Sequence, residues 1–126
     1  MENINLIKLV KSENWNILYN SDKKIIVDFT ASWCGPCQKI APLFKELSVK
    51  YKDLLFIKVD VDEFEEVSEE MEVTCMPTIL FLKNKKVIYR LEGADETKLK
   101  TYTAIFNEYI DQTSESSSSS ESEKYH

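Results

Sequence analysis

The chain has 126 residues, of which 43% are hydrophobic and 30% charged, a composition typical of one folded domain with an ordinary core. Its net charge of −6 argues against nucleic acid or anionic lipid as the main partner, because both require a basic surface. No apolar run approaches the roughly 18 residues that a membrane-spanning helix requires, so we expect no membrane partner.

The cysteine count and the N-terminus indicate the compartment. Three cysteines are too few, and odd in number, for a scaffold held together by disulfides. The first residues mix Glu2, Asn3, Asn5 and Lys8 with apolar side chains, which differs from a secretory signal peptide. These features favour a reducing compartment, and we expect a cytoplasmic protein.

The first elements alternate between strand and helix. Residues 4–10 alternate loosely and predict a strand. Ser12 can cap a short helix that directs three side chains toward the core: Trp15, Leu18 and Tyr19. Residues 25–30 form a β-branched and aromatic run that predicts a buried strand.

A longer helix is expected to begin at the cysteines near residue 34. Apolar side chains recur there at helical spacing: Ile40, Leu43, Phe44, Leu47 and Tyr51. Pro36 fits the first turn, where its missing N–H would be unpaired anyway. Pro42 lies about two turns in and should bend the helix.

The next strand and helix follow the same alternation. Residues 54–59 are almost continuously apolar, as in a strand covered on both faces. Asp62, followed three residues later by Glu65, predicts a capped helix start. That helix would bury Phe64, Val67 and Met71.

The last part of the domain predicts a hairpin and a helix. Residues 78–82 and 87–91 are strands joined by a tight turn at Asn84-Lys85, a weaker turn signal than Asn-Gly. A final helix is expected from about residue 96 to 110, with one apolar stripe: Leu99, Tyr102, Phe106 and Tyr109.

This order predicts an α/β fold with a central mixed five-stranded sheet flanked by four helices. We expect one domain over residues 1–111. From residue 112 the chain is rich in serine and glutamate and lacks apolar periodicity, so residues 112–126 are expected to be a disordered tail.

The motif with the clearest chemistry is Trp33-Cys34-Gly35-Pro36-Cys37. Two cysteines three residues apart at a helix start have sulfurs that face the same way and can join in one small ring. The unpaired N–H groups and the helix dipole favour the thiolate of Cys34. Redox chemistry is therefore expected, although half of a zinc site, a static disulfide and two free buried thiols are alternatives.

The sequence resembles the thioredoxin family over roughly residues 4–111. The resemblance rests on the motif at 33–37, on Val27-Asp28-Phe29, on Cys75-Met76-Pro77-Thr78 and on Gly93-Ala94. It implies the thioredoxin fold and a protein-disulfide reductase with a redox-active centre, acting in electron transport and cell redox homeostasis. It implies no bound cofactor and no metal.

The resemblance also implies roles within the motif. Cys34 would be the nucleophile and the exposed sulfur, and Cys37 would resolve the mixed disulfide. Gly35 would leave room for the substrate backbone, and Pro36 would stiffen the ring. Trp33 would be a flat apolar contact surface; the alternative is an ordinary core residue.

Asp28 interrupts an apolar strand and is expected to be buried, which would raise its pKa. The alternative is an aspartate that faces solvent. By resemblance, Asp28 lies behind Cys37 and relays the proton that Cys37 loses. Lys58 lies where some thioredoxins place a lysine near that aspartate, but it could be an ordinary strand-end lysine.

The substrate groove is likewise implied by the resemblance. Pro77 would follow a cis peptide bond facing the cysteines and expose the backbone of Met76 for pairing with a substrate segment. Gly93 and Ala94 would border the same groove.

Two further residues have open interpretations. By resemblance, Asp62 lies near Trp33, though capping could be its only role. Cys75 is the leftover thiol, either a small filler beside the groove or a regulatory site.

The implied partners are thioredoxin reductase, which would bring NADPH and flavin, and oxidised proteins such as peroxiredoxins. A monomer is expected. One alternative is an oxidase or isomerase of the secretory pathway. The other is a thioredoxin domain that serves as a binding or scaffold subunit.

Overall fold

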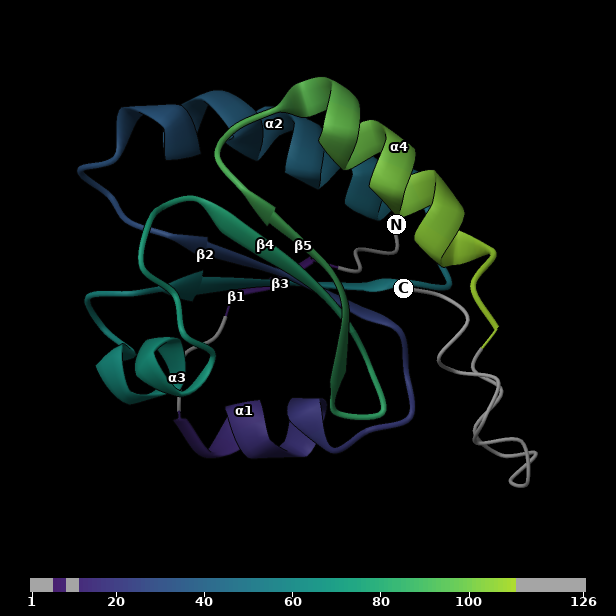
Figure 1. The fold of residues 1–126 in the computed structure, drawn as a ribbon, viewed down its shortest axis with the longest axis horizontal. Coiled ribbons are helices and arrows are strands. Elements are labelled where there is room, and N and C mark those ends of the chain that lie inside the picture. The colour runs from purple at the N-terminus through teal and green to yellow at the C-terminus, as the bar shows by residue number, and fades with distance from the viewer. Residues whose placement is uncertain (1–5, 9–11, 111–126) are drawn as a thin grey trace.

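The computed structural model describes residues 6–8 and 12–110. Its elements, in chain order, are β1 (Leu6–Lys8), α1 (Ser12–Tyr19), β2 (Ile25–Thr30), α2 (Gly35–Lys50), β3 (Leu55–Asp60), α3 (Glu65–Glu70), β4 (Thr78–Lys83), β5 (Lys86–Glu92) and α4 (Glu96–Asn107). The strands form a five-stranded sheet in the order β1-β3-β2-β4-β5 (Figure 1). The first three strands of that order are parallel, and β4 and β5 are antiparallel to their neighbours. The predicted mixed α/β sheet is confirmed.

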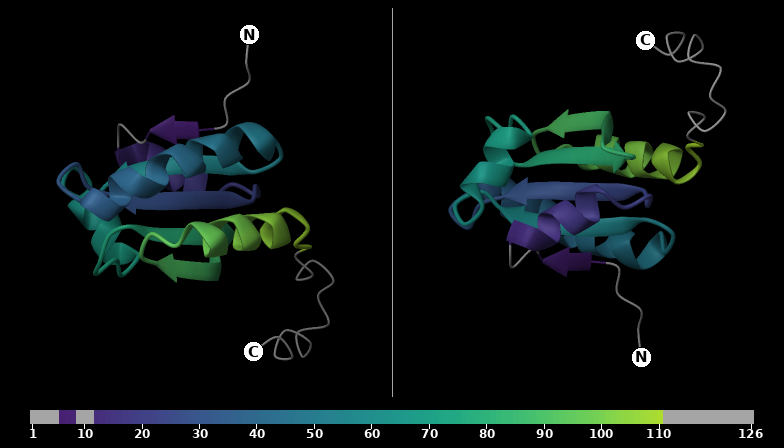
Figure 2. Two further views of the ribbon diagram at one scale, coloured as in Figure 1. Left: turned by 90° about the horizontal axis from the view of Figure 1, so that it is seen from above. Right: turned by 90° about the horizontal axis from the view of Figure 1, so that it is seen from below.

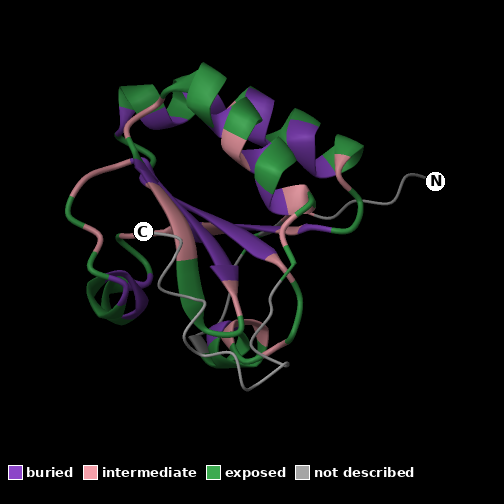
Figure 3. Ribbon diagram, turned by 45° about the vertical axis from the view of Figure 1, so that its right-hand side comes forward, coloured by how far each residue is buried: buried purple, intermediate pink, exposed green. Residues whose placement is uncertain are grey.

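Helices cover both faces of the sheet. Helices α2 and α4 lie on one face, and α1 and α3 lie on the other (Figures 1 and 2). Along β2, Ile25, Val27 and Phe29 join the core beneath α1 and α3, whereas Ile26 joins the core beneath α2 and α4. The alternation of the strand therefore places Asp28 on the α2 side. Figure 3 shows β2 and β4 buried between these layers, whereas the edge strand β5 is mostly intermediate or exposed.

The last helix ends earlier than expected. Helix α4 stops at Asn107, whereas the sequence predicted an end near residue 110. The ammonium group of Lys24, just before β2, donates hydrogen bonds to the carbonyls of Phe106, Asn107 and Tyr109, at 3.2, 2.7 and 3.0 Å. Phe106 and Asn107 lie in the last turn of α4 and Tyr109 lies just beyond it, so Lys24 stabilises the end of the helix at this point.

The predicted cap of α3 is wrong. The helix begins at Glu65 after Phe64, which makes no side-chain capping bond, and Asp62 does not cap it. Instead, the carboxylate of Asp60 accepts hydrogen bonds from the backbone N–H groups of Asp62 and Glu63, at 2.8 and 3.4 Å. Asp60 therefore stabilises the turn that separates β3 from the helix.

The hairpin between β4 and β5 is as tight as predicted. Its two turn residues, Asn84 and Lys85, have φ angles of 53° and 66°. Two consecutive left-handed residues give the turn type whose twist matches that of the flanking strands. Lysine accepts this conformation less readily than glycine, which is why the turn signal in the sequence was weak.

Three expectations fall outside what the structure tests. The ends of the predicted strand at 4–10 and the tail at 112–126 lie outside the described residues. Helix α2 continues through Pro42, and the bend expected there stays a prediction.

Within residues 6–8 and 12–110, none of the helices has the length and apolar character that crossing a membrane demands.

Candidate active site

The two cysteines of the motif lie where β2 gives way to α2. Cys34 is the N-cap of α2, with an extended backbone, and the N–H of Cys37 donates to the Sγ of Cys34 at 3.1 Å. The two sulfurs are joined in a disulfide across a Cα–Cα distance of 5.3 Å. The predicted position at a helix start is confirmed. Among the residues that the structure describes, no three His, Cys, Asp or Glu side chains gather as metal ligands would.

The disulfide is less accessible than expected. Cys34 is only 5% exposed and Cys37 is 1% exposed, so the expectation of an exposed Cys34 sulfur is wrong. The pair packs against Ala31, Val61 and Met76, and the Sγ of Cys34 lies 3.6 Å from the carbonyl oxygen of Met76. The loop that carries Met76 therefore covers the sulfur, and Cys34 remains the more accessible of the two.

The residues around the opening are arranged for contact with a partner. Trp33 is 65% exposed, which makes it a surface residue and excludes the core interpretation. Its Nε1 donates to the Oδ2 of Asp62 at 2.8 Å, so the expected proximity of Asp62 is confirmed. A Cβ atom built on Gly35 would meet no atom within 4 Å, which leaves open space beside the ring. Pro36 lies in the first turn of α2, as predicted.

Asp28 is completely buried, so the alternative of an aspartate that faces solvent is wrong. Neither of its carboxylate oxygens has a hydrogen-bond partner among the described residues. This burial raises the pKa of Asp28 to about 7, and the charge of Lys58 opposes the increase. Lys58 lies beside Asp28 on β3, in register with it. A carboxyl group with this pKa can accept and release a proton near neutral pH.

The loop before β4 has the expected geometry. The Met76-Pro77 peptide bond is cis, as predicted. The carbonyl of Pro77 accepts a hydrogen bond of 2.9 Å from the N–H of Gly93. Gly93 has a φ of +102°, a conformation that L side chains rarely adopt, which explains the glycine. The end of β5 is therefore attached to the start of β4 beside the disulfide.

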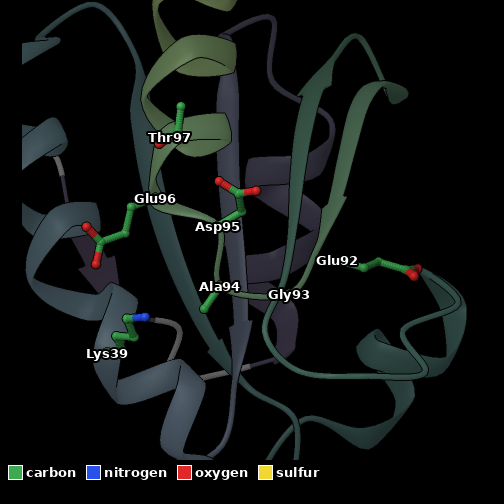
Figure 4. A pocket seen from close by; sticks show the side chains of 7 residues that line it. All are labelled: Lys39, Glu92, Gly93, Ala94, Asp95, Glu96 and Thr97. Carbon is green, nitrogen blue, oxygen red and sulfur yellow. The ribbon is translucent and has the colours of Figure 1, made fainter.

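Gly93 and Ala94 border an open recess of about 550 Å³. Figure 4 shows the residues that line it: Lys39, Glu92, Gly93, Ala94, Asp95, Glu96 and Thr97. The lining includes neither the cysteines nor Met76 and Pro77, so the groove expected beside the disulfide stays a prediction, and the sequence analysis did not identify Lys39 of α2 as a lining residue. The helical spacing of α2 could have indicated it, because Lys39 lies one turn after Gly35 on an exposed face.

Cys75 is a free, half-buried cysteine. Its Sγ lies 3.8 Å from the Oγ1 of Thr78, whose hydroxyl donates to the carbonyl of Cys75 at 2.6 Å. Both interpretations of Cys75, filler and regulatory thiol, stay predictions.

Sequence reasoning also missed Arg90 in β5. Its guanidinium group donates hydrogen bonds to the backbone between α3 and β4. The available signal was the same as for Asp28: a charged residue inside an apolar strand, Val87-Ile88-Tyr89-Arg90-Leu91.

Comparisons with known proteins agree with this geometry. The family model for thioredoxin matches residues 5–105. The thioredoxin of Homo sapiens is 45% identical over 89 residues, which is 71% of this chain and 82% of the relative. Thioredoxin-1 of Caenorhabditis elegans is 44% identical over 97 residues, which is 76% of this chain and 84% of the relative.

Solved structures give the same result. The crystal structure of thioredoxin NaTrxh from Nicotiana alata superposes with a TM-score of 0.78 at 37% identity, covering 84% of this chain and 96% of that one. Thioredoxin from Plasmodium falciparum has a TM-score of 0.74 at 38% identity, covering 82% and 98%.

The disulfide at the start of α2 and these relatives together establish the activity. The protein is a thiol–disulfide oxidoreductase that acts on protein disulfides through Cys34 and Cys37, and the redox group is its own cysteine pair, as in its relatives. The chain belongs to the thioredoxin family.

Proposed function

We propose that this protein is a general reductant of protein disulfides, with Cys34 as nucleophile, Cys37 as resolving thiol and thioredoxin reductase as the source of electrons. The observation that carries the proposal is the Cys34–Cys37 disulfide at the N-terminus of α2, beside an open space at Gly35 and the exposed Trp33.

The exchange proceeds in two steps that balance. The Cys34 thiolate attacks one sulfur of a substrate disulfide, forms a mixed disulfide and releases the other substrate sulfur as a thiolate. The Cys37 thiolate then attacks the Sγ of Cys34, which releases the second substrate thiolate and forms the 34–37 disulfide. The substrate gains two electrons and two protons. The reductase returns two electrons from NADPH through its flavin.

The geometry supports Cys34 as the attacking thiol. It lies at the N-cap, where the N–H of Cys37 donates to its Sγ, and it is the more exposed cysteine. Hydrogen bonds from backbone N–H groups and the positive end of the helix dipole stabilise a thiolate more than a thiol. Gly35 leaves open space beside the ring, and Pro36 would stiffen the ring.

We assign the proton transfer in the second step to Asp28. Cys37 must lose its proton before it attacks, and Asp28, with its pKa raised to about 7 by burial, can accept it at neutral pH. Asp28 lies on the side of β2 that faces α2, the helix that carries Cys37. Lys58, in register with Asp28, limits the increase in its pKa.

The substrate-binding surface consists of Trp33, Asp62, Met76, Pro77, Gly93 and Ala94. The backbone of Met76 lies beside the Sγ of Cys34, so a substrate segment paired with it would bring its disulfide to the nucleophile. Trp33, fixed by its hydrogen bond to Asp62, supplies an exposed apolar contact surface.

The partners and the setting belong to the same proposal. Peroxiredoxins are proposed substrates. One similar solved structure, with a TM-score of 0.74 and 34% identity, comes from work on the thiol resolving mechanism in yeast mitochondrial 1-Cys peroxiredoxin via glutathione/thioredoxin systems. The acidic composition and few cysteines support a cytoplasmic monomer. We propose one domain over residues 1–111, followed by a Ser/Glu-rich tail at 112–126.

Reduction of insulin disulfides with NADPH and thioredoxin reductase tests the proposal. We expect turnover by the full chain, loss of turnover in Cys34→Ser, and retention in the matched control Cys75→Ser. Activity with dithiothreitol but not with the reductase would contradict only the recycling step. A full chain that is inactive with both electron donors would favour the scaffold alternative and contradict the proposal.

A further inference from the structure

The loop that carries Met76 is held by β5 at its far end. This segment, residues 71–77, is called the groove loop here; it follows α3 and leads into β4. At its far end the carbonyl of Pro77 accepts the hydrogen bond from the N–H of Gly93, directly after β5. The near end of the loop, at Met71 and Glu72, directly follows α3.

Arg90 holds the near end. Its Nη1 donates to the carbonyl of Met71 at 3.2 Å, and its Nη2 donates to the carbonyl of Glu72 at 2.6 Å. Its Nε donates to the Oε2 of Glu92 at 3.0 Å, which orients the guanidinium group from within the same strand. All three nitrogens of one side chain are thereby engaged.

The sheet register explains why Arg90 points to this loop. Arg90 pairs with Leu80 on β4. Leu80 belongs to the core cluster that includes Val67 and Met71 from α3 and its end. Residues directly opposite in an antiparallel pair share a face of the sheet, so the side chain of Arg90 extends toward α3.

The backbone at this point needs such a partner. Glu72 has a left-handed φ of 58°, and the N–H of Val73 bonds back to the carbonyl of Ser68, so the chain reverses as it leaves α3. The carbonyls of a helix end have no partner within the helix. A guanidinium group can bind two of them at once because its N–H groups form a rigid planar fork, which an ammonium group lacks.

We propose that Arg90 is a positioning residue for substrate binding: by fixing the carbonyls of Met71 and Glu72, it sets where the groove loop presents the backbone of Met76 to a protein substrate. The inference rests on the proposed role of Met76 in docking the substrate. It adds that β5 holds the loop at both ends, through Arg90 and through Gly93.

Kinetics with two kinds of substrate test this role. In Arg90→Met, we expect the KM for insulin to rise about fivefold, as lost loop hydrogen bonds of roughly 1 kcal/mol imply, with kcat changed less than about twofold. The rate constant for reduction of dithionitrobenzoate by the pre-reduced protein should change less than about twofold, because this small disulfide needs no strand pairing with Met76.

Arg90→Lys keeps the charge but not the planar fork of N–H groups, so its KM for insulin should lie between those of the wild type and Arg90→Met. Lys86→Met, which removes a charge at the opposite end of β5, is the matched control and should match the wild type.

Hydrogen exchange tests the loop without any substrate. The amide of Val73 should exchange about tenfold faster in Arg90→Met, while the amides of β2 and β3 keep their wild-type rates. An unchanged KM for insulin, an equal loss with both substrates, or a uniform increase in exchange across the sheet would each overturn the inference. Wild-type protein that fails to reduce insulin would contradict the proposed function instead, and the exchange of Val73 would still decide whether Arg90 holds the loop.

Discussion

Strands β2 and β5 each contain a charged residue between apolar neighbours, Asp28 and Arg90, and the two side chains have opposite surroundings. Asp28 in β2 is fully buried, and its oxygens have no hydrogen-bond partner among the described residues. Arg90 in β5 is partly exposed, and its nitrogens bind two backbone carbonyls and Glu92. An unpaired buried polar group costs roughly 1–3 kcal/mol, whereas a satisfied one contributes to stability. This difference is consistent with the two proposed roles, proton transfer for Asp28 and loop positioning for Arg90.

The largest expected effect concerns the stability cost of Asp28. In the unfolded chain the Asp28 carboxyl loses its proton near pH 4, whereas in the folded protein it keeps the proton to about pH 7. The free energy of unfolding of the wild type therefore falls as the pH rises between these values. Asp28→Asn cannot ionise. It should therefore unfold with a free energy higher than that of the wild type by on the order of 4 kcal/mol above pH 7, and the difference should shrink toward pH 4.

Urea unfolding at pH 4 and pH 8 measures this difference, with Asp22→Asn, at an exposed aspartate, as the matched control. A stabilisation by Asp28→Asn that is the same at both pH values would show that ionisation is not the cause. Equal behaviour of the two variants would contradict the burial argument.

The next effect concerns the rate of the second step. Positioned general bases contribute about 10²–10⁴-fold, so Asp28→Asn should slow the attack of Cys37 on the mixed disulfide by about 100-fold near neutral pH. The first attack by Cys34 should change little, because its activation comes from the N-terminus of α2. Single-turnover mixing with a disulfide protein, quenched with acid, resolves the two steps; an equal loss in both would contradict the assignment of Asp28 to Cys37.

The smallest effect concerns the stability that Arg90 supplies, and its sign is opposite to that of Asp28. Arg90→Met loses the bonds to Met71 and Glu72 and should unfold with a free energy lower by about 1–2 kcal/mol. Glu92→Gln should cost less than about 1 kcal/mol, because the ion pair with Arg90 is partly exposed. Urea unfolding at pH 7 compares the two; a larger loss in Glu92→Gln would show that the ion pair, and not the contact with the loop, matters.

The sequence predicted what local patterns determine. Periodicity located the strands and helices and most of their buried side chains, and the cysteine spacing predicted the ring at the start of α2. The errors arose where distant segments meet. Burial of Cys34 depends on Met76, and the end of α4 depends on Lys24, neither of which is near in sequence. The error at Asp62 has a local cause. The carboxylate of Asp60, two residues earlier, accepts the hydrogen bond from the Asp62 N–H in the turn before α3, and Asp62 does not cap the helix.

The same reason explains why one charged strand residue was found and the other missed. Asp28 stood out because the resemblance assigned it a role, whereas Arg90 acquires a role only through carbonyls 18 and 19 positions away in the chain. The groups it binds are backbone atoms, which carry no signature in the sequence. A charge inside an apolar strand therefore indicates that a partner or a function exists, but only the fold identifies it.

Alkylation of the reduced protein tests the central claim most directly, namely that the N-terminus of α2 holds Cys34 as a thiolate. The protein is treated with iodoacetamide at pH 7, and the modified positions are mapped by mass spectrometry over time. We expect Cys34 to be labelled before Cys37 and Cys75, and at least about tenfold faster than a free peptide thiol. Labelling of Cys34 no faster than that of the peptide would contradict it.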